Sequence, residues 1–335
     1  MTAHVPANAP PTPAPVFPPL PETPLVSVVM PAYNAGPYLE AAIRSVLEQD
    51  YPAVELIVVD DGSSDGTPEF AAGFGERVRV LRQRNAGPAA ARNRGMAAAR
   101  GELVAFLDAD DVWLPGKLRA QVDHLRSHPE VGIVYGAFLR WSAGPDGSFG
   151  PPPVPPGADP GVPLVREQSG WIYTGLLFDN IVHVITAMLR KPVVDRLGGF
   201  DESLRTGEDY DFWLRASRQF QAAKLNRTLA WYRLHATSTT RVPRVENNEY
   251  RVLSKMLEQY GATGPDGVSA AASRVRERLF QLCFSHGYFH YWQGSPGVAA
   301  QAFREALGHA RLRPKAWGYW ALATIRARLA QFRSQ

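Results

Sequence analysis

Residues 103–111 read Leu-Val-Ala-Phe-Leu-Asp-Ala-Asp-Asp, and this stretch decides the fold. Its first five residues are apolar and include β-branched and aromatic types, a pattern typical of a buried strand. Three carboxylates follow, separated by a single alanine. Unpaired carboxylates at the edge of a core are unfavourable, and a bound cation relieves their mutual repulsion. We therefore predict a strand whose carboxyl end carries the acids of a ligand site.

The chemistry of these acids favours a metal ion. In open α/β sheets, ligands bind at the carboxyl ends of the strands. Mg²⁺ and Mn²⁺ take oxygen ligands and often bridge substrate phosphates. Asp108 and Asp110 are therefore predicted to form a metal–diphosphate site. A polar turn followed by a helix cap explains the same acids equally well, so this stretch alone leaves both interpretations open.

Length and composition are those of a globular protein with a substantial core. The chain has 335 residues, of which 45% are hydrophobic and 20% charged, enough for one large α/β domain with an appendage or for two domains. The single cysteine, Cys283, excludes a disulfide framework and predicts a reducing, cytoplasmic setting. No apolar run reaches the roughly 18 residues of a membrane span. The N-terminus also lacks the basic start and apolar core of a signal peptide.

The first part of the chain predicts a parallel sheet. Residues 1–24 are dominated by proline and alanine and are expected to be disordered and outside the fold. Residues 26–30 then read as a strand, residues 37–47 have helical apolar spacing, and residues 54–59 read as a second strand that ends in acids. This order predicts a βαβ unit. The unit lacks the G-x-G-x-x-G turn of dinucleotide folds, which argues against a hydride-transfer enzyme.

Three side chains near these strand ends are candidates for binding a nucleotide. Tyr33 follows the first strand and Asp61 the second, where an aromatic face and a carboxylate suit a nucleobase. A loop tyrosine and an aspartate that accepts from turn amides are the alternative. Arg92 lies in the helix predicted before the acidic strand, where a guanidinium can grip a phosphate with two hydrogen bonds. A solvent-facing arginine is the alternative there.

Taken together, the sequence resembles the family 2 glycosyltransferases, which have the nucleotide-sugar-binding GT-A fold. The four segments that carry the resemblance, in the order and spacing of that family, are residues 26–34, 58–67, 85–95 and 103–111. The resemblance covers residues 25–240. It implies an α/β fold with a Rossmann-like, mostly parallel central sheet flanked by helices, divided into a nucleotide-sugar half (25–111) and an acceptor half (112–240).

The resemblance also implies roles for residues of the first half. It implies a donor nucleotide at Pro31, Tyr33 and Asp61, and it makes Asp108 and Asp110 the metal-binding D-x-D motif. Asp110 is the surer direct ligand. The full set predicted to bind the nucleotide sugar is Pro31, Ala32, Tyr33, Asn34, Asp61, Arg92, Asp108 and Ala109.

A second cluster of acids occurs in the acceptor half. Residues 207–214 read Gly-Glu-Asp-Tyr-Asp-Phe-Trp-Leu, which predicts the start of a helix. Acids in the first turn suit the helix dipole, but three of them exceed the need for capping. This segment and residues 198–202 look like the acceptor-side motifs of the same family. The resemblance implies that Asp209 is the general base, with Glu208 as the less favoured candidate. Structural capping remains the alternative.

The histidine at the end of the acceptor half is a further candidate metal ligand. In many relatives a histidine in this position reaches the metal or the diphosphate, and His235 with Ser238 matches that pattern. A surface histidine is the alternative reading of His235.

From residue 241 onward the pattern is helical and basic. This region contains 14 Lys and Arg against 6 Asp and Glu, a net charge of +8, whereas the rest of the chain carries −4. Basic residues mixed with aromatic ones favour the surface of an anionic membrane. A helical cap on the catalytic domain is the alternative. Nucleic acid is not expected as a partner, because no recognisable module for it is present.

These observations lead to one preferred function. We expect a metal-dependent, inverting glycosyltransferase that moves a sugar from a nucleoside-diphosphate sugar to a hydroxyl of a carbohydrate or lipid-linked acceptor, with Mn²⁺ or Mg²⁺ as cofactor. Cell-surface polysaccharide or glycolipid synthesis is the expected setting, in the cytoplasm or at the inner face of the cell membrane. A non-catalytic protein that binds nucleotide sugars or glycans on the same fold is the alternative.

Overall fold

The structure is a computed structural model that describes residues 13–157, 163–236, 238 and 244–333. The chain divides into two compact units. Of the described residues, an α/β unit contains those within 13–173 and 180–236. A helical unit contains residues 174–179, 238 and 244–333.

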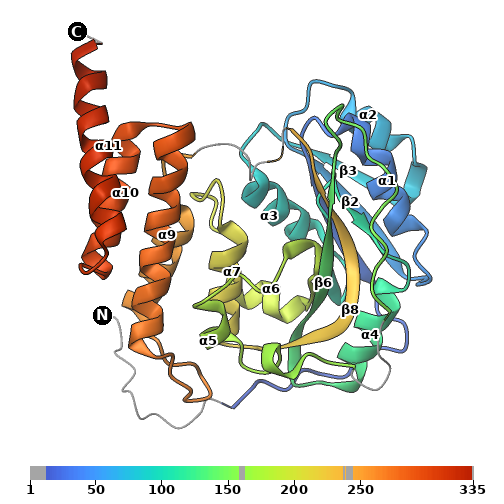
Figure 1. Ribbon diagram of the computed structural model, residues 1–335. Coiled ribbons are helices and arrows are strands. Elements are labelled where there is room, and N and C mark those ends of the chain that lie inside the picture. Colours follow the sequence, from blue (N-terminus) through green and yellow to red (C-terminus); the bar gives the residue numbers. More distant parts are fainter. Residues whose placement is uncertain (1–12, 158–162, 237, 239–243, 334–335) are drawn as a thin grey trace. The chain divides into compact units, whose positions relative to one another are not determined.

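The first half of the α/β unit alternates strands and helices, as its sequence pattern predicts (Figure 1). Its elements are β1 (Val26–Ala32), α1 (Gly36–Leu47), β2 (Val54–Asp60), α2 (Thr67–Ala72), a 3-10 turn (Gly75–Arg77), β3 (Val78–Arg82), α3 (Pro88–Ala98) and β4 (Leu103–Phe106). β4 is buried along its whole length, as the apolar run that opens residues 103–111 predicts.

The second half adds two long strands and two short ones. Its elements are β5 (Val112–Trp113), α4 (Lys117–Ser127), β6 (Val131–Ser142), a 3-10 turn (Arg166–Gln168), a 3-10 turn (Val184–Thr186), β7 (Met188–Arg190), α6 (Lys191–Leu197), α7 (Glu208–Ser217) and β8 (Gln221–Leu234). The short helix α5 (Tyr173–Leu176) begins in this unit, and its residues 174–176 are counted with the helical unit. Helix α4 begins at Lys117, because Val112 and Trp113 before it pair with β8 as a short strand.

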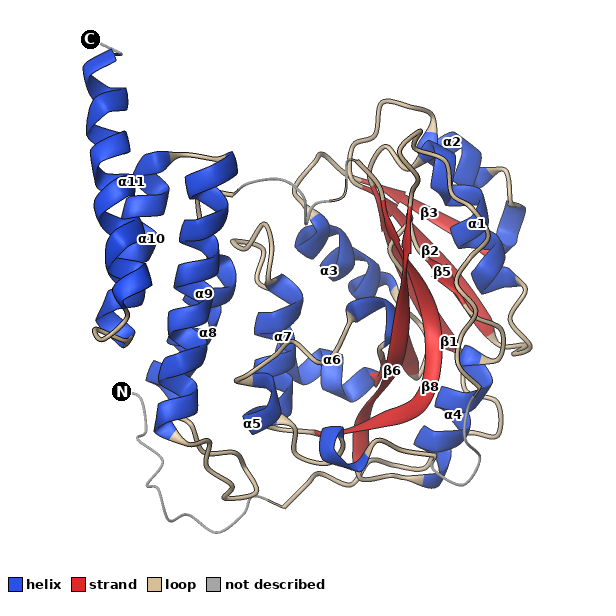
Figure 2. Ribbon diagram, in the orientation of Figure 1, coloured by secondary structure: helices blue, strands red, loops and turns tan. Residues whose placement is uncertain are grey.

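All the strands named above form one mixed, mostly parallel sheet in the order β3-β2-β1-β4-β7-β6-β8-β5 (Figure 2). β1 is parallel to both β2 and β4, whereas β7 is antiparallel to β4 and β6. Helices α1, α2 and α4 cover one face of the sheet, and α3, α6 and α7 cover the other (Figure 1). The prediction of a Rossmann-like, mostly parallel central sheet flanked by helices is confirmed.

Helix α3 lies unusually close to β1. Gly95 sits in the middle of α3, and a Cβ atom at this position would be 2.3 Å from Cγ1 of Val29 on β1. Only a residue without a side chain permits this approach. The contact fixes the height of α3, and therefore of Arg92, above the ends of the central strands.

The N-terminal segment departs from the expectation that residues 1–24 lie outside the fold; residues 1–12 fall outside the described part of the chain. Phe17 is only 6% exposed, and its ring stacks on Phe220 at a centroid distance of 5.9 Å. The Phe17 amide donates to the carbonyl of Pro129 at 2.9 Å. One aromatic side chain buries enough apolar surface to anchor a short segment that is otherwise poor in apolar groups.

The helical unit contains α8 (Asn248–Tyr260), α9 (Ala272–Gln293), α10 (Pro296–His309) and α11 (Pro314–Arg333), as the helical pattern after residue 241 predicts. Its core joins Phe280 and Cys283 of α9 to Leu307 of α10 and Ala316 of α11. The pKa of the Cys283 thiol is raised by burial to about 12, so the thiol is protonated at neutral pH. Among the described residues, none of the helices is both long and apolar enough to cross a membrane.

Candidate functional site

The candidate site lies where the strand order of the sheet reverses. The chain runs outward from β1 to β2 and β3 and then returns to β4 on the other side of β1. The crevice beyond the carboxyl ends of strands at such a switch point is the usual ligand site of an open α/β sheet. Tyr33 follows β1, Asp61 follows β2, and Asp108 lies two residues beyond β4. The fold therefore brings three separately predicted residues to one edge.

The loops after β1 and β2 are tied together by hydrogen bonds. Asn34 has a positive φ of 48°. Its amide donates to the Ser63 hydroxyl at 2.9 Å, and its side-chain oxygen accepts from the Ser64 amide at 2.9 Å. The Asp61 amide donates to the Ala32 carbonyl at 2.8 Å. These bonds fix the two loops relative to each other at the carboxyl ends of β1 and β2.

Tyr33 and Asp61 have different surroundings at these strand ends. The Tyr33 side chain is 56% exposed, whereas Asp61 is buried. The Asp61 carboxylate accepts from the Gln83 side chain and from the amides of Ala86 and Gly87 at 2.8–2.9 Å. Its contacts are therefore those of an aspartate that satisfies turn amides, whereas Tyr33 presents an open aromatic face. Pro31 is half-buried and Ala32 buried at the end of β1.

Arg92 connects the two acidic segments. Its Nη2 lies 2.7 Å from Oδ1 of Asp108, and its Nη1 lies 2.7 Å from Oε1 of Glu208. The Arg92 and Glu208 side chains are 5% and 9% exposed, so their ion pair is shielded from water, whereas Asp108 is partly exposed. The sequence predicts a guanidinium that grips a phosphate. In the structure both terminal nitrogens of Arg92 bind carboxylates, which joins the end of β4 to the start of α7.

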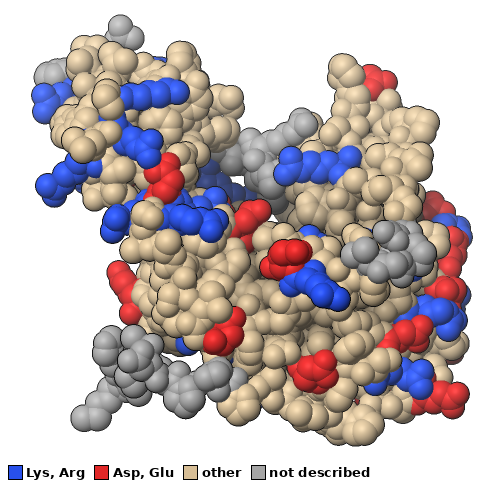
Figure 3. Space-filling view, turned by 60° about the horizontal axis from the view of Figure 1, so that its bottom comes forward, with Lys and Arg blue, Asp and Glu red and all other residues tan. Residues whose placement is uncertain are grey.

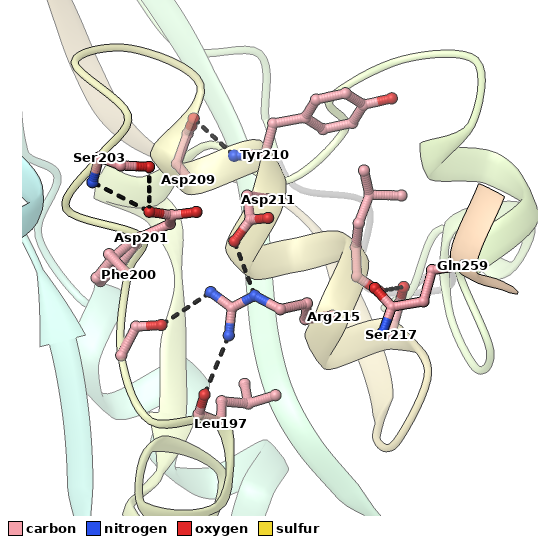
Figure 4. Close-up of polar contacts among 12 residues, drawn as sticks. Leu197, Phe200, Asp201, Ser203, Asp209, Tyr210, Asp211, Arg215, Ser217 and Gln259 are labelled. Atoms are coloured by element: carbon pink, nitrogen blue, oxygen red, sulfur yellow. Dashed lines mark hydrogen bonds and ion pairs between the residues drawn. The ribbon is translucent and has the colours of Figure 1, made fainter. Parts of the chain in front are cut away.

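Helix α7 is held in place by its own acids and by the preceding loop (Figure 4). Arg215 donates to Asp211 at 2.7 Å and to the carbonyls of Leu197 and Gly199 at 3.1 and 2.8 Å. Asp211 is 1% exposed. This contact gives Asp211 a structural role and leaves Glu208 and Asp209 as the acids of α7 that face the site.

A pair of hydrogen bonds from Asn93 fixes the loop before α7 to α3. The Asn93 side-chain oxygen accepts from the Phe200 amide at 2.8 Å, and its nitrogen donates to the Phe200 carbonyl at 2.9 Å. Gly199 has a φ of +97°, and a Cβ atom there would lie 2.6 Å from the Asn93 oxygen. The glycine pair at residues 198–199 therefore permits close packing of this loop on α3.

Burial governs the ionisation of the two remaining acids. It raises the pKa of Asp209, against the opposing attraction of Arg92 and hydrogen bonds from the Tyr210 amide (2.8 Å) and the Asn180 side chain (3.1 Å). Burial also raises the pKa of Glu208, and the Asp209 charge adds to this effect. A carboxylate with a raised pKa is a stronger base than an exposed one, which suits proton abstraction from an alcohol.

The end of β8 brings His235 to the D-x-D segment. Nε2 of His235 lies 3.1 Å from Oδ2 of Asp110, and its ring stacks on Tyr38 with centroids 4.6 Å apart. Arg233, also on β8, donates its backbone N–H to Asp111 at 2.8 Å and its side chain to the Asp110 carbonyl at 3.1 Å. Asp111 is fully buried, and burial raises its pKa well above the usual range. Asp111 is therefore a structural residue that positions Asp110.

The donor set fits a metal ion that is shared with a substrate. Across the described part of the chain, no three His, Cys, Asp or Glu side chains are grouped so that they could hold a metal by themselves. Asp110 and His235 nevertheless form a contacting pair, and 35% of the Asp110 side chain is exposed. Mg²⁺ is usually bound by one or two carboxylates together with substrate phosphates. Asp110 and His235 match that arrangement, whereas Asp108 is already paired with Arg92.

Several polar residues of the site were not anticipated from the sequence. Asn180 contacts Asp209, and Arg233 contacts the D-x-D segment. His183 packs against Phe138 and Tyr232 at centroid distances of 4.3 and 4.9 Å. Asn180 and His183 lie in residues 171–184, a mainly apolar stretch, and the few polar side chains within it were the available signal.

The sequence matches known glycosyltransferases. Residues 27–150 match the profile of the family described as "Glycosyl transferase family 2". The chain is 31% identical over 240 residues to the "Putative teichuronic acid biosynthesis glycosyltransferase TuaG" of Bacillus subtilis, a match that covers 69% of this chain and 85% of the relative. It is 29% identical over 240 residues to an uncharacterized glycosyltransferase of Rickettsia prowazekii, covering 69% and 70% of the two chains.

Solved structures show the same fold. TarS 1–349 of S. aureus, in complex with UDP, superposes with a TM-score of 0.63 at 19% identity, over 93% of this chain and 92% of TarS. The mannosyltransferase PcManGT of Pyrobaculum calidifontis, in complex with GDP-Man and Mn²⁺, gives a TM-score of 0.54 at 21% identity, over 95% and 84% of the two chains. The architecture is thus that of GT-A glycosyltransferases. With the family profile and the match to TuaG, this shows that the chain is a transferase enzyme and belongs to glycosyl transferase family 2.

Proposed function

We propose that the protein transfers a sugar from a nucleoside-diphosphate sugar to a hydroxyl of its acceptor, with inversion at the anomeric carbon. The observation that carries this proposal is the buried bridge from Asp108 through Arg92 to Glu208. This bridge joins the end of β4, which lies beside the proposed nucleotide site, to helix α7, which bears Asp209. A donor and an acceptor bound on either side of this bridge meet beside the half-buried carboxylate of Asp209.

The donor half of the proposed site is formed by the ends of β1, β2 and β4. Tyr33 offers its exposed ring to the nucleobase, and Pro31, Ala32, Asn34, Asp61 and Ala109 shape the crevice around it. TarS has been crystallised with UDP and with UDP-GlcNAc, and PcManGT with GDP-Man and Mn²⁺, which supports a nucleoside-diphosphate sugar as donor. Uridine and guanosine donors are therefore the first to test.

The proposed cofactor is Mn²⁺ or Mg²⁺, held by Asp110 and His235, with Asp108 beside them. Bound there, the metal neutralises charge on the leaving diphosphate. Asp110 and His235 contribute an oxygen and a nitrogen at the carboxyl end of the central strands. Arg92 keeps the neighbouring Asp108 fixed, so the positive charge of its guanidinium lies close to the same diphosphate.

Asp209 is the proposed general base. The acceptor hydroxyl attacks the anomeric carbon of the donor from the face opposite the diphosphate, and its proton passes to the Asp209 carboxylate as the new C–O bond forms. The bond from the anomeric carbon to the diphosphate oxygen breaks, and the nucleoside diphosphate leaves with that electron pair. General-base assistance of this kind contributes about 10²–10⁴-fold to the rate.

The proposed acceptor is a cell-surface polysaccharide or a lipid-linked glycan. The name of TuaG assigns that relative to teichuronic acid biosynthesis, which supports a polysaccharide setting. We further propose that the helical unit contacts the inner face of an anionic cell membrane. Its exposed apolar side chains include Trp292 at 61%, Trp317 at 47% and Ile325 at 56%. Figure 3 shows several Lys and Arg side chains over the same helices. Aromatic and basic residues together suit the headgroup region of a bilayer.

A nucleotide screen tests the site. We expect one of UDP, GDP, UDP-GlcNAc or GDP-Man to raise the melting temperature in the presence of Mn²⁺, because a ligand that binds the folded state stabilises it by mass action. Asp110→Ala should abolish the metal-dependent part of the shift, and Asp123→Ala, a matched change at an exposed aspartate of α4, should not. No stabilisation by any of these nucleotides would contradict the proposed donor site.

Turnover separates the proposed enzyme from a non-catalytic binding protein. A radiolabelled donor incubated with the protein, Mn²⁺ and bacterial lipid-linked glycans should release nucleoside diphosphate and yield a labelled product. The anomeric configuration of that product, determined by NMR, should be opposite to that of the donor. Tight binding of a donor without any release would favour the binding protein.

A vesicle experiment tests the membrane contact. The protein should sediment with vesicles that contain phosphatidylglycerol but not with phosphatidylcholine vesicles, and added salt should weaken the binding. Trp317→Ser combined with Ile325→Ser should reduce sedimentation, whereas Val16→Ser, at a position 74% exposed in the other unit, should not. Equal binding by both variants would contradict this part of the proposal.

A further inference from the structure

The amide of Asn180 has two different environments. Its nitrogen donates to Oδ2 of Asp209 at 3.1 Å. Its oxygen is buried and has no hydrogen-bond partner among the described residues. The orientation follows from charge, because the opposite one would place the amide oxygen against a carboxylate oxygen. A buried acceptor without a partner is unfavourable, so the free oxygen requires an explanation.

The Asp209 carboxylate is held at both of its oxygens. Oδ1 accepts from the Tyr210 amide at 2.8 Å, and Oδ2 accepts from Asn180. The first contact comes from the next residue in the chain and fixes the side chain relative to α7. The second comes from 29 positions away, from the segment between α5 and the 3-10 turn at Val184–Thr186. Asn180 is therefore the side chain that sets the direction of Asp209 relative to the rest of the site.

The surroundings of the same segment suit a polar ligand. His183 lies three residues further on, and its Nδ1 is also buried without a hydrogen-bond partner in the described part of the chain. Burial lowers the pKa of His183 to about 4, so the ring is neutral at pH 7. Its ring and those of Phe138 and Tyr232 form an aromatic cluster, with His183 4.3 Å and 4.9 Å from the other two. The charges of Asp108 and Arg92 shift the pKa of both His183 and Asp209.

We propose that Asn180 positions the base through its amide nitrogen and binds a second hydroxyl of the acceptor through its amide oxygen. This inference rests on the proposed function, in which Asp209 takes the proton of the attacking hydroxyl. The amide nitrogen already bonds to Asp209, so a hydroxyl at the amide oxygen lies about one amide group away from a hydroxyl at Asp209. Two hydroxyls on adjacent carbons fit this short spacing. The acceptor is then a sugar or polyol with two neighbouring hydroxyls, one directed at Asp209 and the other at Asn180.

The charged groups around Asp209 set its pKa, so the effect of Asn180 on Asp209 can be measured as a change in that pKa. Arg92 from α3 favours the ionised carboxylate, whereas Asp108 after β4 and Glu208 on α7 oppose it. The Asn180 N–H adds to the effect of Arg92. Removing this donor should therefore raise the pKa of Asp209, and replacing it with a second carboxylate should raise it further.

Carboxyl NMR of the ligand-free protein tests the first half of the proposal. Protein labelled with ¹³C at the aspartate carboxyl is titrated, and the Asp209 signal is identified by its loss in Asp209→Asn. In Asn180→Ala we expect the midpoint of Asp209 to rise by about one pH unit, and in Asn180→Asp by more. Asp179→Asn, which removes a charge at the adjacent exposed residue, is the control and should leave it unchanged. An unchanged midpoint in both Asn180 variants would overturn the positioning role.

A diol titration tests the second half. The side-chain amide signal of ¹⁵N-labelled protein, assigned by its loss in Asn180→Asp, is followed during addition of cis-1,2-cyclohexanediol or cyclohexanol. The diol should move the signal at lower concentration than the mono-alcohol, because only the diol can reach Asp209 and Asn180 together. Equal responses to the two compounds would overturn the acceptor assignment.

These readouts separate the inference from the proposed function. Both measurements use the protein without donor or metal, so they give a result whether or not sugar transfer is detected. If a donor is turned over, the acid limb of the kcat/KM profile should move to higher pH in Asn180→Ala while nucleotide stabilisation stays unchanged. A purely structural role of Asn180 would lower the rate equally at every pH.

Discussion

Arg92 and Glu208 lie 116 positions apart in the chain and form a buried ion pair, with Nη1 and Oε1 separated by 2.7 Å. The same guanidinium holds Asp108, so one side chain links α3, the end of β4 and the start of α7. Each of these segments carries a motif that is only suggestive when read alone. The ion pair is the physical reason why they make one site.

Loss of this bridge should be strongly destabilising. Arg92→Met leaves Asp108 and Glu208 without their partner, and breaking a buried ion pair costs about 3–5 kcal/mol because an uncompensated charge remains. The free energy of unfolding from urea titrations should fall by that order. Arg94→Met, two positions along α3 at an exposed arginine, is the matched control and should change stability by at most about 0.5 kcal/mol. Similar stabilities for the two variants would show that the bridge is not formed.

The two acids of α7 should respond differently to neutralisation. Asp209→Asn should lower turnover by about 10²–10⁴-fold and leave nucleotide stabilisation intact, because the base acts only in the transition state. Glu208→Gln should act mainly on stability, since it weakens the pair with Arg92. Initial rates and thermal shifts measured on both variants decide the assignment. If Glu208→Gln loses turnover and Asp209→Asn keeps it, the base is Glu208.

The raised pKa of Asp209 has a consequence for stability. A carboxyl whose pKa is higher in the folded state than in the unfolded state contributes stability below its unfolded pKa of about 3.9, and this contribution is lost as the pH rises through the folded value. Wild type should therefore lose stability relative to Asp209→Asn as the pH is raised from 4 toward 8. Urea unfolding of both proteins across this range measures the difference. A constant difference at all pH values would contradict the raised pKa.

The close approach of α3 to β1 should be intolerant of a methyl group. Gly95→Ala places a Cβ within 2.3 Å of Val29, and such overpacking costs about 1–3 kcal/mol. Val29→Ala should partly rescue Gly95→Ala, so the double variant should lose less stability than the sum of the single ones. Gly308→Ala on α10, where no atom lies within 4 Å of the new Cβ, should instead be neutral or slightly stabilising. Thermal unfolding of the four variants tests this; strict additivity would contradict the contact.

Lys117 should make stability depend on alkaline pH. Its ammonium is fully buried, donates to Gln121 at 2.7 Å and lies 3.9 Å from the centroid of the Trp113 ring. Burial lowers the pKa of Lys117 well below its usual value, so the folded state gains relative stability as the pH rises toward 10.5. In Lys117→Met, the free energy of unfolding should not show this increase with pH. The measurement is the difference in unfolding free energy between pH 7 and pH 10; an identical pH dependence in both proteins would contradict it.

The pattern of apolar residues along the chain was sufficient to predict most strands and helices in the first half of the α/β unit. The apolar strands at residues 26–30, 54–59 and 103–107 and the helices between them were predictable, because a βαβ unit places its signal in consecutive residues. The acids at 108–111 were also readable, since a buried strand that ends in carboxylates is unusual for packing reasons alone. The helical character of the chain after residue 241 followed from its apolar spacing in the same way.

Long-range pairing was not predictable from local pattern. Strand β5 has only two residues, and only their antiparallel partners on β8 make them a strand. Phe17 lies in a proline-rich segment, and its burial depends on Phe220, which is about 200 positions away. The proline-rich composition predicted a segment outside the fold and could not reveal that the Phe17 ring anchors it.

The sequence by itself determined which chemical groups this protein has: acids at the ends of strands and at the start of α7, a tyrosine and an arginine near them, and a basic helical region. Only the tertiary structure decided which groups meet. It pairs Arg92 with two carboxylates, gives Asp111 and Asp211 to structural bonds, and brings Asn180 to Asp209. The reason is that composition and spacing follow the covalent chain, whereas hydrogen bonds and desolvation depend on distances that only the packed fold creates.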